Sequence, residues 1–269
     1  MCSLFRRYAC FLLFLYAVAA NAETKPLVFC ADPSNVPFST RGRTGFENRI
    51  AAVLAHEMKM DVRFYWARMG RGFLRNVLNK GECDALLGVP IGMRGLLLTR
   101  PYYRSSYVFV TRENAQPLSS FDDPRLNSMR IGVQVLDDDY APPARALARR
   151  GLARNIVGFE MEEKPGAIVS SVAEGKLDVA VVWGPVAGFY AHQVATTSGK
   201  KLRLSPILPS VDPPALPFAY DLAAGVRKNA PNLQRGLDQA IVRARPKIEA
   251  ILRQYHVPLL SQENLLASK

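Results

Sequence analysis

Few side chains in this 269-residue sequence are placed for chemistry. Glu47 follows Gly45-Phe46 at the start of a predicted helix, and it is the one carboxylate that we would test as a general base. The competing interpretation is a first-turn glutamate that is stabilised by the helix dipole. The histidines, His56, His192 and His256, show no metal-ligand spacing, and no serine nucleophile motif occurs. We therefore predict that the protein is not an enzyme and needs no cofactor or metal.

Three consecutive acids, Asp137, Asp138 and Asp139, follow a predicted strand. Hard cations such as Ca²⁺ are held by several carboxylate oxygens, but the Asp-x-Asp-x-Asp loop with its closing glutamate is missing from the sequence. The alternative is a solvated turn in which one aspartate caps the next helix. We expect Asp137 and Asp138 to border a ligand cleft without forming a metal site.

Aromatic and basic residues supply the remaining candidates. Trp66 and Trp183 could line an apolar cleft or pack between two lobes, since aromatic faces bury a large area. Arg71 and Arg75 could bind an anion or dock on an acidic partner, or they could lie on a helix face in water. Both alternatives are open for each pair.

An internal repeat indicates which elements position these side chains. Residues 81–90 and 175–185 both read Gly-x-x-Asp, an apolar run, Gly and Pro, and they lie about 94 positions apart. Repeats of solenoid proteins are much shorter, so this separation predicts two similar βα lobes. The chain is long enough for one large domain or two small ones with ample core.

Strands and helices alternate along the chain, which is typical of parallel βα units. Residues 206–217 are rich in proline and are predicted to be a linker, and the strand after them needs partners in the first lobe. We predict an α/β protein with helices on both faces of each sheet and two crossover strands. Lobe 1 comprises residues 23–111 and 217–269, and lobe 2 comprises residues 112–216. The predicted strands are 27–30, 61–66, 84–88, 107–110, 130–135, 156–159, 178–182 and 218–226, and the predicted helices are 46–58, 72–80, 143–150, 167–174, 186–194, 231–243 and 246–255.

Residues 1–22 have the pattern of a secretory signal peptide. Arg6-Arg7 precede an apolar run over 8–20, and Ala20-Asn21-Ala22 fits a cleavage site. A membrane anchor is the alternative, but the run is shorter than the roughly 20 residues that span a bilayer. We expect an exported, periplasmic protein without a membrane span. The precursor has 35 basic and 23 acidic residues, and the leader holds two of the basic ones, so the mature charge is 33 minus 23, or +10.

Two cysteines remain after cleavage, Cys30 and Cys83. An exported protein can form disulfides. However, Cys30 closes the first predicted strand and Cys83 precedes the third, so in neighbouring parallel strands they would lie at opposite ends, about 10 Å apart. The two alternatives, a disulfide and two free thiols, are both left open.

Ligands of doubly wound parallel sheets lie outside the carboxyl ends of the strands. Tyr102 and Tyr103 precede a crossover strand and are assigned to a hinge or a cleft wall. The predicted cleft residues are Asp32, Asn35, Phe38, Glu47, Trp66, Arg71, Pro90, Tyr102, Tyr103, Asp137, Asp138 and Trp183.

Several of these motifs resemble the type II periplasmic binding proteins, which are the solute-binding components of ABC importers. The resemblance rests on Gly45-Phe46-Glu47, on Pro101-Tyr102-Tyr103, on Ile131-Gly132-Val133-Gln134 and on residues 178–185. It implies two lobes with a ligand cleft between them. Amino-acid receptors of this fold typically have a carboxylate where this chain has Trp183 and small hydroxyl residues where it has three aspartates. A standard amino-acid ligand is therefore not expected.

Longer segments are similar to the J proteins of methanol-oxidation gene clusters. These segments include CADPSNVPFS, GFENRIA, CDALLGVP, TRPYYRSSYVFV and VVWGPVAGFYA, and the similarity covers essentially the whole mature chain. It implies an accessory factor that binds, activates or assembles a PQQ-dependent methanol dehydrogenase. The alternatives are a receptor for an importer of a small ligand that is not an amino acid, and an enzyme similar to the cyclohexadienyl dehydratases of this fold. Nucleic acid is not expected as a partner in the periplasm.

Overall fold

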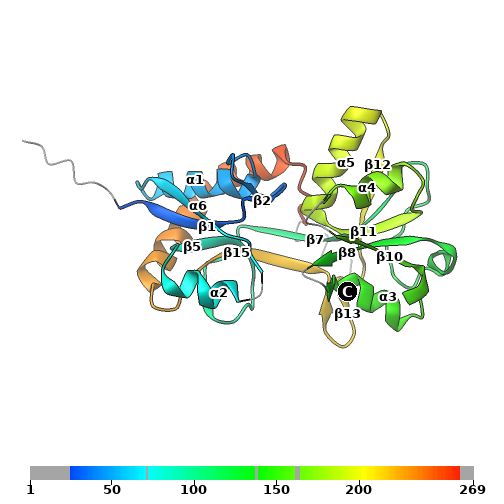
Figure 1. Ribbon diagram of the computed structural model, residues 1–269, viewed down its shortest axis with the longest axis horizontal. Coiled ribbons are helices and arrows are strands. Elements are labelled where there is room, and N and C mark those ends of the chain that lie inside the picture. The colour runs from blue at the N-terminus through cyan, green and yellow to red at the C-terminus, as the bar shows by residue number, and fades with distance from the viewer. Residues whose placement is uncertain (1–24, 71, 137–138, 161–163, 261–269) are drawn as a thin grey trace, which may run out of the picture.

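The computed structural model describes residues 25–70, 72–136, 139–160 and 164–260. The predicted signal peptide and the candidate residues Arg71, Asp137 and Asp138 lie outside these ranges. The described chain forms two lobes side by side, connected by the long strands β7 (Tyr103–Arg112) and β15 (Ala219–Arg227) (Figure 1). The boundaries of lobe 1 and lobe 2 given above stay a prediction.

Helices and strands alternate in both lobes, as the sequence pattern indicates. The helices are α1 (Phe46–Glu57), α2 (Phe73–Asn76), α3 (Pro142–Arg149), α4 (Ala167–Ala173), α5 (Gly184–Ser198) and α6 (Pro231–Gln254), with 3-10 helices η1 (Leu78–Lys80), η2 (Pro124–Ser128) and η3 (Ala153–Asn155). The other strands are β1 (Leu27–Ala31), β2 (Ser34–Asn35), β3 (Ser39–Thr40), β4 (Val62–Trp66), β5 (Ala85–Pro90), β6 (Leu96–Leu98), β8 (Ile131–Leu136), β9 (Asp139–Tyr140), β10 (Ile156–Glu160), β11 (Val179–Trp183), β12 (Leu202–Pro206), β13 (Val211–Asp212) and β14 (Leu216–Pro217).

One sheet runs through both lobes in the order β10-β8-β11-β7-β15-β5-β1-β4. In lobe 1, β1 is parallel to β4 and β5, and in lobe 2, β8 is parallel to β10 and β11. The crossover strands β7 and β15 pair with each other in antiparallel orientation at the centre. Each lobe is therefore a βα unit, and both crossover strands belong to the boundary between them.

The sequence repeat marks equivalent strand starts in the two lobes. In lobe 1, the Asp84 carboxylate accepts a hydrogen bond from the Val28 N–H (3.0 Å), and the Asp84 N–H donates to the Val28 carbonyl (2.7 Å). In lobe 2, Asp178 makes the same two bonds with Arg130, at 2.8 and 3.1 Å. The aspartate of Gly-x-x-Asp thus joins the start of one strand to its neighbour in each lobe, so this aspartate serves the fold.

Alternate strand residues face different helices, so both faces of each lobe are covered. In lobe 1, Phe29 packs with Phe46 of α1 and Leu237 of α6, whereas Cys30 packs with Phe73 of α2. In lobe 2, the α3 side and the α4–α5 side have separate apolar clusters. This alternation is the period of two expected for strands buried on both faces.

A disulfide joins Cys30 and Cys83, whose Cα atoms are 5.4 Å apart. The estimate of about 10 Å from ideal strands was wrong because β5 begins only at Ala85, opposite Phe29. Residues 81–84 form a turn before that strand, so Cys83 does not continue it backwards along the sheet. The bond lies under α2, in the apolar cluster of that face.

The C-terminal helix is continuous, although two helices were predicted around Pro246. α6 extends from Pro231 to Gln254 with Pro246 inside it. The proline removes the N–H that would bond to the Val242 carbonyl. Val242 is 48% exposed, so water can reach that side of the helix, while Ala244 and Ile248 are buried against lobe 1 on either side of the proline. Tertiary packing therefore outweighs the local preference for a break.

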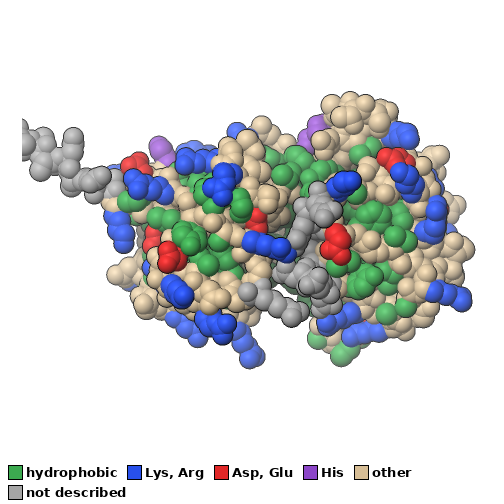
Figure 2. Space-filling model, viewed as in Figure 1, with side chains coloured by type: hydrophobic (Ala, Val, Ile, Leu, Met, Phe, Trp, Pro, Cys, Tyr) green, Lys and Arg blue, Asp and Glu red, His purple; other side chains and the backbone are tan. Residues whose placement is uncertain are grey.

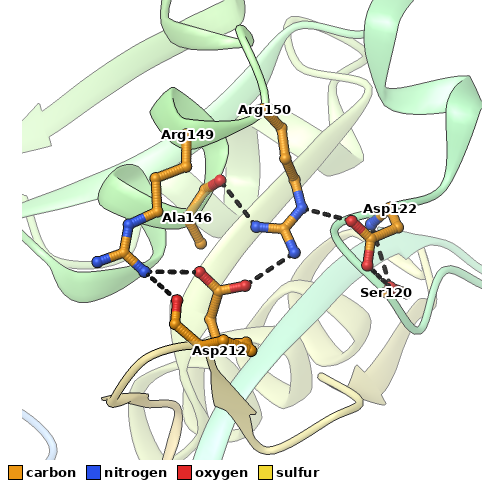
Figure 3. A network of polar contacts seen from close by, with 7 residues as sticks. Ser120, Asp122, Ala146, Arg149, Arg150 and Asp212 are labelled. Carbon is orange, nitrogen blue, oxygen red and sulfur yellow. Dashed lines mark hydrogen bonds and ion pairs between the residues drawn. The ribbon is translucent and has the colours of Figure 1, made fainter.

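The proline-rich passage is more ordered than a linker. β12 pairs with β7, and β13 and β14 form a small hairpin. Figure 3 shows how Asp212 of this hairpin is held: its carboxylate accepts hydrogen bonds from Arg149 (3.0 Å) and Arg150 (2.8 Å), both near the end of α3. Arg150 also bonds Asp122 at 2.7 Å, and its guanidinium holds the pKa of both carboxyls below their usual range. The network attaches the passage to lobe 2.

The segment after α6 returns to lobe 2. Ser105 Oγ donates to the Pro258 carbonyl at 2.7 Å, and the Leu260 N–H donates to the Arg104 carbonyl at 3.2 Å. The His256 ring stacks on His192 of α5, with ring centroids 3.6 Å apart. Residues 255–260 therefore form a further connection between the lobes, which we call the C-terminal strap.

Candidate ligand cleft between the lobes

A cavity of about 460 Å³ opens between the lobes, beside the crossover strands. Its volume is within the usual range of small-molecule sites. Lobe 1, the crossover strands and lobe 2 all contribute to its walls. The lining residues are Ser34, Asn35, Val36, Phe38, Glu47, Met69, Leu87, Gly88, Pro90, Tyr103, Tyr107, Gln134, Pro165, Trp183, Val186, Tyr220 and Leu222.

The start of α1 fixes the position of Glu47. Asn48 Oδ1 accepts hydrogen bonds from the Gly45 N–H (3.2 Å) and the Thr40 N–H (2.9 Å), and the Glu47 N–H donates to the Phe38 carbonyl (2.9 Å). A Cβ on Gly45 would lie 2.1 Å from the Phe38 carbonyl oxygen, so only glycine allows this approach. The loop before the helix and the first helical turn are thus one unit that directs Glu47 into the cleft.

The Glu47 carboxylate rests on the backbone of Gly88. Gly88 has φ +69°, and a Cβ there would lie 2.4 Å from Glu47 Oε1, so both its conformation and its neighbour require glycine. Burial raises the pKa of Glu47 to about 7 and therefore outweighs the stabilising helix N-terminus. Burial and the Glu47 charge raise the pKa values of Tyr102 and Tyr103 well above their usual range. Glu47 is thus a carboxyl group that changes charge near neutral pH.

Aromatic rings form the wall on the lobe 2 side. Trp183 ends β11, and its backbone N–H donates to Gln134 Oε1 at 2.6 Å. The Tyr107 and Tyr220 rings lie 5.3 and 5.7 Å from the Trp183 ring, in tilted orientations of 62° and 71°. Such edge-to-face contacts are favourable, and they fix the three rings relative to one another.

Six of the predicted cleft residues line the cavity: Asn35, Phe38, Glu47, Pro90, Tyr103 and Trp183. Tyr102 lies behind the wall, where its hydroxyl accepts a hydrogen bond from the Gly88 N–H at 2.9 Å. Asp32 stabilises the adjacent loops by accepting bonds from the Ser34 and Met69 N–H groups. Their part in ligand binding stays a prediction.

Trp66 is absent from the lining, contrary to the sequence prediction. It ends β4, which is the last strand of the sheet, and it stacks on Phe64 with ring centroids 5.2 Å apart. Arg75 is exposed on the short helix α2 and contacts its neighbour Asn76. The predicted cleft residues Arg71, Asp137 and Asp138 lie outside the described residues.

Tyr107 and Tyr220 are the main cleft residues that the sequence analysis missed. Tyr107 is opposite Trp183 in the pairing of β7 with β11, and Tyr220 is opposite Ser105 in the pairing of β15 with β7. Both occur in predicted strands, and an aromatic residue in a crossover strand was the available signal. Their meeting depends on strand register, which the sequence did not provide.

Charge in the cleft contrasts with the rest of the molecule. Lys and Arg side chains are spread over both lobes in Figure 2, and residues 23–269 have a formal charge of +10. Among the described residues, the cleft lining contains no Lys, Arg or His, and Glu47 is its one acidic side chain. The described cleft therefore offers no positive group to a ligand carboxylate.

Metal ions and membranes are two further kinds of partner to consider for the described residues. Within the described ranges, no three or more His, Cys, Asp or Glu side chains are grouped in a way that could hold a metal ion. Over the same part of the chain, no helix is both long enough and apolar enough to cross a bilayer.

Solved structures of similar architecture define the class of the protein. MxaJ from Methlophaga aminisulfidivorans MPT is 25% identical, with a TM-score of 0.75 over 87% of this chain and 100% of that chain. The periplasmic binding protein XoxJ from Methylobacterium extorquens AM1 is 35% identical, with a TM-score of 0.71 over 88% of this chain and 100% of that chain. The ancestral cationic amino acid solute binding protein AncCDT-1 shares the fold at 21% identity and a TM-score of 0.66, over 86% of this chain and 95% of that chain. The chain has the type II periplasmic binding protein fold.

Sequence relatives identify the family within this class. Protein MoxJ of Methylorubrum extorquens is 32% identical over 267 residues, which cover 92% of this chain and 86% of that protein. Protein MoxJ of Paracoccus denitrificans is 30% identical and covers 91% of this chain and 92% of its own length. No family model matches the chain. The chain belongs to the MoxJ family, which is linked to methanol oxidation.

Proposed function

We propose that this protein is a periplasmic accessory factor that binds a PQQ-dependent methanol dehydrogenase and helps to activate or assemble it. The observation that carries this proposal is the match to MoxJ along 92% of the chain. The signal-peptide pattern of residues 1–22 and the binding-protein relatives support a periplasmic location.

An arginine-rich surface on lobe 1 gives this partnership a physical basis. Arg41 lies over the Trp66 ring at 5.8 Å, and Arg43 lies over the Phe64 ring at 5.5 Å. Both arginines are exposed, and the two rings stack on each other along the edge strand β4. Guanidinium groups that are already ordered on aromatic faces lose less entropy when a partner binds.

A third arginine continues this surface. Arg49 lies over the Tyr255 ring at 5.9 Å, and the Tyr255 hydroxyl donates to the Thr44 carbonyl. Thr44 is in the loop that carries the first two arginines, so this loop adjoins the Tyr255 ring. We call these three arginines, with the rings beneath them, the arginine ridge. Arginine and aromatic side chains are the types that contribute most at protein interfaces, and we propose that this ridge binds an acidic face of the dehydrogenase.

Binding of the purified dehydrogenase to immobilised residues 23–269 tests the proposal, at 50 and 300 mM salt. We expect saturable binding that weakens at the higher salt concentration, because exposed charges are screened. The triple variant R41A/R43A/R49A should lose at least tenfold in affinity. The matched control removes three exposed cations of lobe 2, Arg154, Lys200 and Lys201, and should change the affinity less than twofold. No binding at micromolar concentrations rejects a direct partnership, and equal losses in both triple variants reject the ridge as its site.

The cleft supports a second candidate function, a solute receptor for an importer. A cavity of about 460 Å³ with aromatic walls is suited to a small ligand that is not an amino acid. A ligand that raises the melting temperature of the protein while leaving dehydrogenase binding unchanged would favour this role. An enzyme of the dehydratase kind is the lesser alternative, since Glu47 has a pKa of about 7, and it requires turnover of a small acid that is abolished by Glu47→Gln.

A further inference from the structure

The cleft of this basic protein has the chemistry of a cation site. Basic residues outnumber acids by 33 to 23 in residues 23–269. Even so, the described cleft residues include no Lys, Arg or His, and their one acidic side chain is Glu47. An anionic ligand would meet a carboxylate without compensation, whereas a cation would find a partner for its charge.

Among the described residues, the Glu47 carboxylate has no such partner. No described residue donates a hydrogen bond to it or forms an ion pair with it. The groups that face it are the Gly88 backbone and the phenols of Tyr102 and Tyr103, whose raised pKa values keep them neutral at physiological pH. A partly buried carboxylate without a cation is costly, so a positive ligand would remove an existing penalty.

Aromatic rings complete the site. Tyr107, Trp183 and Tyr220 are tilted relative to one another by 62° and 71°, so their faces point in different directions around the cavity. The faces of aromatic rings attract cations, and methylated ammonium groups also bury their carbon atoms against them. Phe38 and Tyr103 bring further rings from the lobe 1 side.

We propose that the cleft binds a small organic cation, a quaternary or protonated amine, whose charge pairs with Glu47 and whose alkyl groups contact the rings around Trp183. The cation site goes beyond the proposed accessory role and does not depend on it. The arginines of the ridge are exposed and do not line the cavity, so loss of dehydrogenase binding and loss of cation binding are separate outcomes.

Trp183 itself can report on binding. The chain contains two tryptophans, and Trp66→Phe removes the one outside the cleft. In this background, choline is titrated against 3,3-dimethylbutan-1-ol, its uncharged carbon isostere. We expect a saturable change in fluorescence with choline and at least tenfold weaker binding of the isostere. Equal affinities would show that the cleft recognises shape alone, and the proposal would then fail, as it would if choline produced no saturable change.

Glu47 is tested by removing only its charge. Glu47→Gln should weaken choline at least tenfold at pH 8 and leave the isostere unchanged. Glu82→Gln makes the same change on an exposed turn and should alter neither affinity. If choline binds the Glu47→Gln variant as tightly as it binds the wild type, the assignment of Glu47 as its partner is wrong.

The pH dependence provides an independent test, because choline has no titratable proton. With its pKa at about 7, Glu47 is ionised in about a tenth of molecules at pH 6 and about nine tenths at pH 8. Choline affinity should therefore rise about tenfold from pH 6 to pH 8, and the dependence should disappear in Glu47→Gln. A flat profile for the wild type contradicts the proposal.

Discussion

Gly188 should be indispensable for the contact between α5 and the C-terminal strap. A Cβ at this position would lie 1.9 Å from the backbone oxygen of His256. Both groups belong to the backbone, so no side-chain rotation relieves the overlap. In Gly188→Ala, either α5 or the strap must move, and we expect the strap to leave because it is held by fewer contacts.

The loss of unfolding free energy in Gly188→Ala can be estimated from the contacts that the strap makes. The strap makes two hydrogen bonds to the start of β7, worth about 1 kcal/mol each. It also buries Val257, which is 6% exposed and contributes roughly 1.5–2 kcal/mol. The higher helix propensity of alanine offsets about 1 kcal/mol of this loss. The net loss of about 2–3 kcal/mol corresponds to a fall of roughly 5–10 °C in melting temperature.

Gly236→Ala is the matched control, since it is the same substitution inside another helix. A Cβ there meets only the Met58 methyl group at 3.0 Å, at the end of a flexible side chain. This variant should be unchanged or more stable by up to about 1 kcal/mol. Urea and thermal unfolding of residues 23–269, followed by circular dichroism, measure both variants. If Gly188→Ala is as stable as the wild type, the strap does not hold the lobes as described.

Three further variants test other features. Removing the disulfide in Cys30→Ser/Cys83→Ser opens a loop with a sequence separation of 53 and should lower the unfolding free energy by up to about 4 kcal/mol, and an unchanged urea midpoint would refute this. Because burial raises the folded pKa of Glu47 from 4.5 to about 7, wild-type stability falls as pH rises through this window, so Glu47→Gln should be more stable by up to about 3 kcal/mol at pH 8 and equal below about pH 4. Asp212→Asn should cost about 2 kcal/mol at pH 7, since the partly exposed Arg150 loses a buried partner. Asp212 has a lowered folded pKa, so this difference should vanish as pH falls below about 4, and a pH-independent loss would indicate packing instead.

Local sequence signals were sufficient for most of the framework. The Gly-x-x-Asp repeat indicated two similar lobes because each aspartate bonds the neighbouring strand start through contacts that both lobes need. Local signals failed where distant packing decides. Pro246 reads as a break, but buried residues on both sides keep α6 intact. The proline-rich passage reads as a linker, but Arg150 anchors it through Asp212.

The two tryptophans show why the cleft was only partly predictable. Trp66 and Trp183 both end parallel strands, so the rule that ligands lie at carboxyl ends selects them equally. Strand order separates them: Trp66 ends β4 at the edge of the sheet, whereas Trp183 ends β11 beside the crossover strand β7. That order arises from pairing between segments far apart in the sequence, which also places Tyr107 opposite Trp183. Trp183 therefore lines the cavity between the lobes, while Trp66 lies beneath exposed Arg41 at the edge of the sheet, so residues of the same type at the carboxyl ends of parallel strands have different surroundings.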